Sequence, residues 1–484
     1  MDHKRNTIQG IKWTSIDKWS REIISFVVII YLARMLDPAS FGIVALGKVI
    51  LAFLENFYSK NGLEIALIQR EKLEEEHKDA AFWFNVIVAI IMITVAILSS
   101  GYIARFFDEP LLQPIVIALA FSIIAQSLNR VQLGLLKREF RFSTLAKRNI
   151  ATTIISGIVG ISMAYAGYEV WSLVGLYLTN SFVGMILLWY AAAWRPRLAF
   201  SLVHFRELFS FSIYLFFSAM VTSISKQSDK ILIGKFLSME LVGIYKISQT
   251  IVRNINSLIS AAISNVALPV FSRMQNDDKR LLHAYYSNVR LSLFLTAPVL
   301  MILISYPEFI IGTVLGEQWL GGVVVLQLIA LFGIIESISF FNGPVIYAKG
   351  VTKYQLYLTI TNAIINIALI LLLISYGIQG VALAILISAI LNHITFVYLI
   401  KKIINLRVTK HLINIATGII PAVIMYLGMK AIMFMEVDLL YIYRVVVSIV
   451  IGVSLYILMI NIIDRNMFST ILSEIKKLRV SQIS

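Results

Sequence analysis

Apolar stretches of about 20 residues recur along the whole chain and alternate with short polar segments. A helix of that length crosses the hydrocarbon core of a bilayer, which is about 30 Å thick. The pattern predicts about fourteen spanning helices, centred near Phe26, Leu51, Ile90, Phe121, Ile158, Leu178, Phe217, Leu258, Leu300, Leu331, Leu369, Leu386, Ile424 and Ile449. The connections between them are short, and none has the length of a soluble catalytic domain.

The composition agrees with this pattern. The 484 residues are 59% hydrophobic and 14% charged, and the mean hydropathy is +0.83. A soluble domain cannot shield that much apolar surface from water. The sequence therefore predicts an all-α polytopic membrane protein. It contains no cysteine, which excludes disulfides and thiolate metal sites, and its histidines lack metal-ligand spacing, so neither a metal nor another cofactor is expected.

Lysine and arginine residues are concentrated in alternate loops. One set of loops includes Arg70, Lys137, Arg148, Arg195, Lys279, Lys353 and Lys401, whereas the other set holds Arg34, Arg105 and Lys235. The positive-inside rule predicts that the basic loops and both termini lie in the cytoplasm. This distribution also explains most of the formal charge of +15, so no nucleic-acid partner is expected.

Two sequence matches indicate an internal repeat. YLARMLDPASFGIVALGKV at 31–49 aligns with LIGKFLSMELVGIYKISQT at 232–250, which places Arg34 opposite Lys235 and Gly42 opposite Gly243. AGYEVWSL, starting at residue 166, aligns with YGIQGVAL, starting at residue 376, so that two glycines match again. The matches predict two six-helix lobes and two accessory helices, with domains at 1–207, 208–403 and 404–484. Each lobe has an even number of helices, so the repeats run in the same direction, an arrangement that favours alternating access.

Charged side chains lie inside several predicted spans. In the first helix the largely apolar run from Ile23 to Ala33 covers only about 16 Å, so the span must include the charged residues before it. An ionisable group in the bilayer costs about 2.5 to 3.5 kcal/mol on insertion scales and needs a partner or a wet cavity. The predicted lining of a cationic, substrate-binding cavity is Lys18, Arg21, Lys48, Lys60, Lys226, Lys230, Lys246, Gln249, Arg253 and Asn256. The candidate ion-coupling carboxylates are Asp17, Glu22, Glu55 and Asp229.

Cations outnumber carboxylates on these faces, which favours an anionic guest such as a diphosphate. Simpler interpretations stay open for individual residues. Lys18 and Lys60 suit a role as interfacial lysines that reach the headgroups, and Asp229 suits a local counter-ion of Lys226 and Lys230. Three further charged residues are isolated, and a structural hydrogen bond or snorkelling to the headgroups explains each at least as well as function does: Arg130, Glu336 and Arg444.

Several motifs resemble those of Wzx-type polysaccharide flippases, especially the branch that exports colanic and teichuronic acid units. They are LAR-x-L-x-P-x-x-FGI at 32–43, NGLEIALIQ at 61–69, IARFFDEP at 103–110 and LLKREFRF at 135–142. The resemblance implies a fold similar to multidrug and toxic compound exporters, with two lobes in a V. It also implies transfer of an oligosaccharide on an undecaprenyl-diphosphate type of carrier to the outer leaflet of the bacterial plasma membrane. Membrane lipids and the polysaccharide polymerase machinery are the further partners that it implies.

Two rival functions remain at this point. An exporter of cationic drugs shares the implied fold, but it would favour an acidic cavity, whereas this one is basic. A membrane enzyme such as a polymerase or ligase would be expected to carry catalytic groups on a large outer loop, and the outer connections here are short. The absence of a P-loop also excludes ATP hydrolysis by this chain. The sequence therefore favours a transporter that is not an enzyme, and it names neither the sugar nor the coupling ion.

Overall fold

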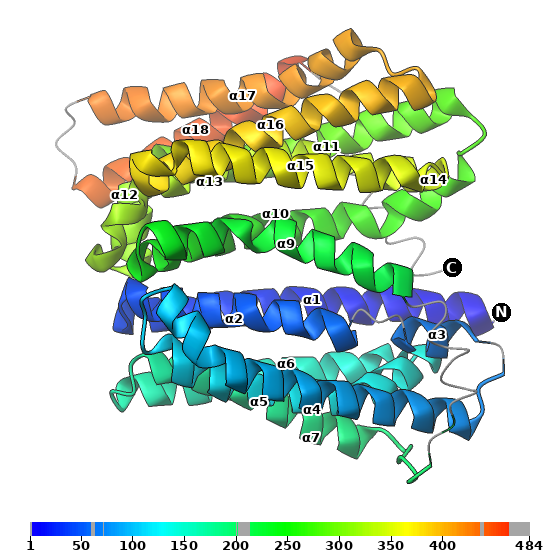
Figure 1. Ribbon diagram of the computed structural model, residues 1–484. Coiled ribbons are helices and arrows are strands. Elements are labelled where there is room, and N and C mark those ends of the chain that lie inside the picture. Colours follow the sequence, from blue (N-terminus) through cyan, green and yellow to red (C-terminus); the bar gives the residue numbers. More distant parts are fainter. Residues whose placement is uncertain are drawn as a thin grey trace. The chain divides into compact units, whose positions relative to one another are not determined.

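The computed structural model describes residues 2–59, 63–70, 72–199, 201, 213–435 and 440–463, and all the regular secondary structure among them is helical. No strand occurs among them (Figure 1). Each of the predicted span centres lies in a helix of its own. The all-α prediction is therefore confirmed.

The first compact unit comprises residues 1–247, 314–319 and 363–381. Its helices are α1 (Asp2–Met35), α2 (Pro38–Ser59), α3 (Leu63–Gln69), α4 (Glu75–Phe106), α5 (Leu112–Arg138), α6 (Phe142–Tyr165), α7 (Val170–Ala191), α9 (Ile213–Phe236) and the start of α10 (Met239–Arg273). Helix α1 packs against α6, α2 against α5 and α9, and α4 against α5. The short helix α3 packs mainly on α5.

The second compact unit comprises residues 248–313, 320–362 and 382–484. The elements that follow α10 along the chain are α11 (Asp278–Ser305), α12 (Pro307–Ile310), η1 (Ile311–Leu315), η2 (Glu317–Gly322), α13 (Val323–Ser339), α14 (Asn342–Ala348), α15 (Thr352–Leu373), η3 (Ile374–Tyr376), α16 (Gly377–Ile404), α17 (Val408–Phe434) and α18 (Tyr441–Ile463). They belong to the second unit, except for residues 314–319 and 363–381, which belong to the first. Helix α11 packs against α13 and α17, and α17 packs against α18. The predicted division at residues 207 and 403 stays a prediction.

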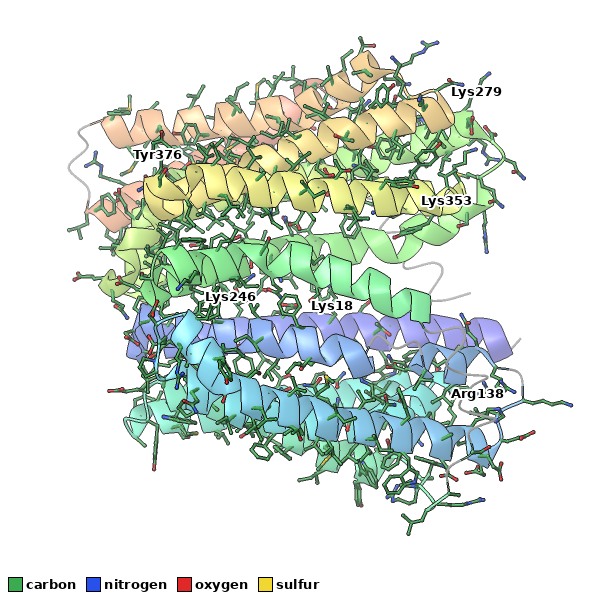
Figure 2. All side chains as sticks on the ribbon, in the orientation of Figure 1. Lys18, Arg138, Lys246, Lys279, Lys353 and Tyr376 are labelled. Atoms are coloured by element: carbon green, nitrogen blue, oxygen red, sulfur yellow. The ribbon has the colours of Figure 1, made fainter. Side chains whose placement is uncertain are left out.

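Nine stretches of the described residues are long and apolar enough to cross a membrane, and one of them, 353–404, runs over both α15 and α16. Helix α1 is not among the nine, although it has 34 residues, and it is the helix that carries four charged residues near its middle. The helices are consistent with about fourteen membrane spans, and that number stays a prediction. Figure 2 shows Lys279 and Lys353, both from loops predicted to be cytoplasmic, at the same end of the second unit.

The two turn glycines that match in the repeat have the same backbone conformation. Gly167 has a φ of 79° and Gly377 has a φ of 71°. This is the left-handed region, which a residue without a Cβ atom adopts at little cost. Both glycines lie in the tight turn between two long helices, so the sequence match reflects an equivalent turn.

Candidate transport site

A charged network joins the middle of α1 to α6. The carboxylate of Asp17 accepts hydrogen bonds from Nε and Nη2 of Arg21, at 2.9 and 3.2 Å, and from Nδ2 of Asn149, at 3.1 Å. Nη1 of Arg148 donates to Oδ1 of Asn149 at 2.7 Å, and its Nε donates to the carbonyl of Gly184 on α7 at 2.9 Å. Arg148 thus reaches the carboxylate only through Asn149, and this network of two guanidinium groups and one carboxylate keeps a net positive charge.

The accessible charge of this network is on α1. The side chain of Arg21 is 44% exposed, whereas that of Asp17 is 14% exposed. Lys18 lies three residues before Arg21, on the same face of the helix, and is half-buried partway along α1 (Figure 2). Glu22 is half-buried on the same helix. The arrangement holds one guanidinium in a fixed position from which it can contact an anion.

Helix α2 presents a lysine and a glutamate two turns apart. Lys48 is exposed, and its Nζ lies 3.7 Å from the centre of the Tyr177 ring on α7, which is a cation–π contact. Oε1 of Glu55 accepts a hydrogen bond from Nε2 of Gln126 on α5 at 2.8 Å. No lysine or arginine among the described residues lies within ion-pair distance of Glu55. The hydrogen-bond partner of the Glu55 carboxylate is therefore a neutral amide and not a cation.

Helix α9 contains a buried ion pair. Nζ of Lys230 lies 3.3 Å from Oδ1 of Asp229, and the two side chains are 5% and 8% exposed. The hydroxyl of Tyr245 on α10 donates to Oδ2 of Asp229 at 2.6 Å, and Oε1 of Gln227 accepts from Nζ of Lys230 at 3.1 Å. The interpretation of Asp229 as the counter-ion of Lys230 is confirmed, and Lys226 is the exposed cation of this helix.

The residues Lys246, Gln249, Arg253 and Asn256 lie at three- and four-residue steps on α10, so they share one face of that helix. Lys246 is half-buried partway along the bundle (Figure 2). Arg253 is exposed and makes no hydrogen bond or ion pair with any described residue. Nδ2 of Asn256 donates to the carbonyl of Gly333 and to Oε2 of Glu336 on α13, both at 3.0 Å.

Glu55 with Gln126 and Asn256 with Glu336 are equivalent pairs in the repeat. Asn256 follows Glu55 by the offset that relates Gly42 to Gly243, and Glu336 follows Gln126 by the offset that relates Gly167 to Gly377. Each pair therefore contains one carboxylate and one amide, but the acid lies on α2 in the first pair and on α13 in the second.

The next residue along each helix supports this register. Ser127 and Ser337 are also matched, and each donates to the carbonyl three residues before it, at 3.0 and 2.8 Å. No cation among the described residues pairs with Glu336, which is exposed. Each half of the chain thus has one membrane carboxylate whose hydrogen-bond partner is an amide.

Sequence reasoning missed several members of these groups. Arg148, which the sequence places in a cytoplasmic loop, lies inside α6, and its neighbour Asn149 was not singled out. Gln126 and Tyr177 were missed because the sequence does not show that they face Glu55 and Lys48 on another helix. Glu336 accepts a hydrogen bond from Asn256, in agreement with one of the interpretations left open for it. Lys60 lies outside the described residues.

The other two isolated charges have structural partners. Arg130 lies 3.1 Å from the carboxylate of Glu64 on α3, which Lys137 also contacts at 2.6 Å. Nη2 of Arg444 donates to the carbonyls of Met433 and Met435, at 2.9 and 2.8 Å. For both arginines these contacts favour the structural hydrogen bond among the interpretations left open.

Two solved structures share the fold of this chain. The lipid II flippase MurJ, in an inward closed conformation, has a TM-score of 0.76 at 17% identity and covers 95% of this chain and 100% of its own. An inward-facing multidrug resistance MATE family transporter of the MOP superfamily has a TM-score of 0.60 at 14% identity. The match covers 83% of this chain and 94% of the transporter. These likenesses confirm the predicted class, an all-α polytopic membrane protein with a MATE-like fold.

The sequence comparisons identify the family. The teichuronic acid biosynthesis protein TuaB of Bacillus subtilis (strain 168) is 26% identical over 356 residues, which are 73% of this chain and 73% of TuaB. The family model described as polysaccharide biosynthesis protein matches residues 31–324, which is more than half of the chain. The chain is therefore a multi-pass membrane protein that belongs to the polysaccharide biosynthesis protein family, as its motifs predict.

Proposed function

We propose that the protein moves an oligosaccharide linked to a polyprenyl diphosphate from the inner to the outer leaflet of a bacterial plasma membrane. It would do so for the synthesis of a surface polysaccharide, with both termini in the cytoplasm. The observation that carries this proposal is the family match, joined to charged side chains held inside the long helices α1, α2 and α10. A family that builds polysaccharide needs to bring sugar units across the membrane, and charges inside the membrane serve a polar cargo.

The exposed cations suit the diphosphate of such a carrier. Arg21 is held by Asp17, Lys48 rests on an aromatic ring, and Arg253 has an exposed guanidinium. A guanidinium binds phosphate oxygens through paired N–H groups, whereas an ammonium acts as a point charge. Amides such as Gln249 suit the sugar hydroxyls. The lipid tail would stay in the bilayer while the headgroup passes, so the polar part alone needs a cavity.

The energy for transport would come from an ion gradient or from the membrane potential acting on the charged headgroup. Glu55 and Glu336 are the best placed carboxylates for ion coupling, because an amide and not a cation contacts each of them. Asp17 and Asp229 are engaged by neighbouring cations, which makes them less free to exchange an ion. Glu22 remains a candidate from the sequence. Alternating access between two six-helix lobes would connect ion binding to cargo movement.

Deletion of the gene in its own host tests this function. Lipid extracts analysed by mass spectrometry should show accumulated polyprenyl-diphosphate oligosaccharide, and the surface polysaccharide should be lost. Wild-type protein should reverse both effects, whereas Arg253→Ala should not. The matched control is Lys279→Ala, which removes an equally exposed cation from the start of α11 and should complement fully.

A different result would redirect the assignment. Normal lipid pools and normal surface polymer, in a host without a second flippase gene, would contradict the proposal and favour an ion-coupled exporter of small molecules. Full complementation by Arg253→Ala would leave the transport function standing but would exclude the proposed role of α10 in binding the cargo.

A further inference from the structure

Two basic residues that match in the repeat make reciprocal contacts at the predicted outer end of the first unit. Arg34 lies in the last turn of α1, and its Nε donates to the carbonyl of Val314 at 2.9 Å. Lys235 lies in the last turn of α9, and its Nζ donates to the carbonyl of Phe106 at 2.7 Å. Phe106 is the last residue of α4, the third long helix of the first repeat, and Val314 lies in η1, shortly after α11, the third long helix of the second repeat. Each half therefore supplies one cation and one acceptor.

Further contacts strengthen each of these two arms. On the first arm the carbonyl of Ala33 accepts hydrogen bonds from Nε2 of Gln318 at 2.9 Å and from Nε1 of Trp319 at 2.8 Å. Trp319 is only 2% exposed, and its ring packs edge-on against Phe41 at 5.3 Å. These contacts fix residues 314–319 against the ends of α1 and α2.

The second arm is built from a different set of groups. Nζ of Lys235 lies 3.3 Å from Oδ2 of Asp108 and 4.9 Å from the centre of the Phe106 ring. Its side chain is 32% exposed, and that of Asp108 is 83% exposed. This arm is thus the more accessible to solvent, and it depends mainly on the carbonyl of Phe106.

The backbones of α2 and α10 approach closely through a second matched pair. A Cβ atom on Gly42 would overlap the carbonyl of Met239 and lie 3.1 Å from the amide nitrogen of Gly243. A Cβ atom on Gly243 would overlap the carbonyl of Pro38 and lie 3.1 Å from the amide nitrogen of Gly42. Both obstacles are backbone atoms, so no side chain can move aside, and only glycine fits at either position.

We propose that Arg34 and Lys235, together with the Gly42–Gly243 crossing, form a two-armed latch that holds the outer end of the transporter closed. The proposal rests on the proposed function, because a transporter that releases cargo outside must open this end. When this end opens, the two repeats separate, and the hydrogen bonds from Arg34 to Val314 and from Lys235 to Phe106 must break. A single hydrogen bond adds little net stability, so the bonds of Arg34 and Lys235 can break and re-form in each cycle.

The absence of cysteine in the chain allows a direct accessibility test. Ala45 lies one turn beyond Gly42 on the same face of α2 and is 7% exposed, so Ala45→Cys reports whether the crossing opens. A membrane-impermeant maleimide added outside intact cells should label this reporter slowly. Arg34→Gln and Lys235→Gln should each raise the labelling rate about fivefold, and together about twentyfold, because each removes one charged hydrogen bond.

Two controls separate a released latch from a damaged protein. Arg105→Gln removes another exposed cation of the outer loops that makes no latch contact, and it should leave the labelling rate unchanged. Ser127→Cys places a reporter at a fully buried position on α5, and it should stay unlabelled in the latch variants if they remain folded.

The possible outcomes distinguish the latch from the transport function. An unchanged labelling rate in the double variant, or an equal rise with Arg105→Gln, would overturn the latch. Labelling needs no cargo, so a faster rate combined with normal lipid pools in the deletion host would keep the latch and reject the proposed cargo. Accumulated carrier lipid with unchanged labelling would reject the latch alone.

Discussion

The acid and the amide occupy opposite positions in the matched pairs Glu55–Gln126 and Asn256–Glu336, and this leads to a specific prediction about Glu336. Glu336→Gln removes the negative charge but keeps the length of the side chain and an oxygen that can accept from Asn256. If the carboxylate charge is used for ion coupling, this change should lower transport at least tenfold. The double variant Asn256→Glu with Glu336→Gln recreates on α10 and α13 the arrangement that Glu55 and Gln126 have on α2 and α5. It should recover at least a third of wild-type transport.

The energies predict that Glu336→Gln does not harm folding. The change replaces a hydrogen bond to a charged group, worth about 1.5 to 3 kcal/mol, by a neutral one, worth about 0.5 to 1.5 kcal/mol. It also removes a charge that costs about 2.5 kcal/mol or more within a membrane helix. The free energy of unfolding should therefore stay the same or rise by about 1 kcal/mol. Lost transport in this variant would accordingly report on mechanism.

Transport is measured as the amount of carrier-linked oligosaccharide that accumulates in the deletion host, with the thermal stability of each purified variant as the control. Two results would refute the reasoning. Wild-type transport by Glu336→Gln would mean that the charge is not used. A double variant as inactive as the single one, although it folds, would mean that the position of the acid matters and that the two pairs are not equivalent.

Three further variants test the contacts that hold the helices in place. Arg138→Ala removes a guanidinium that bonds carbonyls at the end of α3, including that of Leu67 at 3.0 Å, so α3 should detach and limited proteolysis should cut near it at least several times faster. Tyr245→Phe removes the 2.6 Å hydrogen bond to the buried carboxylate of Asp229, which should lower the free energy of unfolding by about 1.5 to 3 kcal/mol, read as an earlier thermal transition. Gly333→Ala forces a methyl group against a side chain of α10 and should cost about 1 to 3 kcal/mol in the same assay. Unchanged proteolysis or an unchanged transition would contradict the corresponding contact.

The fold was largely predictable because it follows from local patterns. Apolar runs of membrane length gave the position of each long helix, and the matched glycines gave two equivalent turns, where Gly167 and Gly377 have positive φ. Helix ends were less predictable. Arg148 was expected in a loop, yet α6 begins earlier, at Phe142, because a polar first turn continues directly into the apolar segment.

The site was predictable only as far as single helices allow. Asp17 lies four residues before Arg21 and Asp229 is adjacent to Lys230, so both ion pairs form between residues close together on one helix. Pairs between helices, such as Glu55 with Gln126, depend on which helices are neighbours and on how each is rotated. Hydropathy does not contain that information, and the internal repeat is the one feature of the sequence that carries part of it.

Transport by the purified protein tests the central claim most directly. Vesicles containing the protein and a labelled polyprenyl-diphosphate oligosaccharide would be treated with an impermeant glycosidase, which cleaves only sugar on the outer leaflet. The account predicts that the protected inner half of the label becomes cleavable with wild-type protein and stays protected with Arg253→Ala and in protein-free vesicles. If the inner half of the label stays protected from the glycosidase with folded wild-type protein, under an ion gradient of either direction, the protein does not move this cargo.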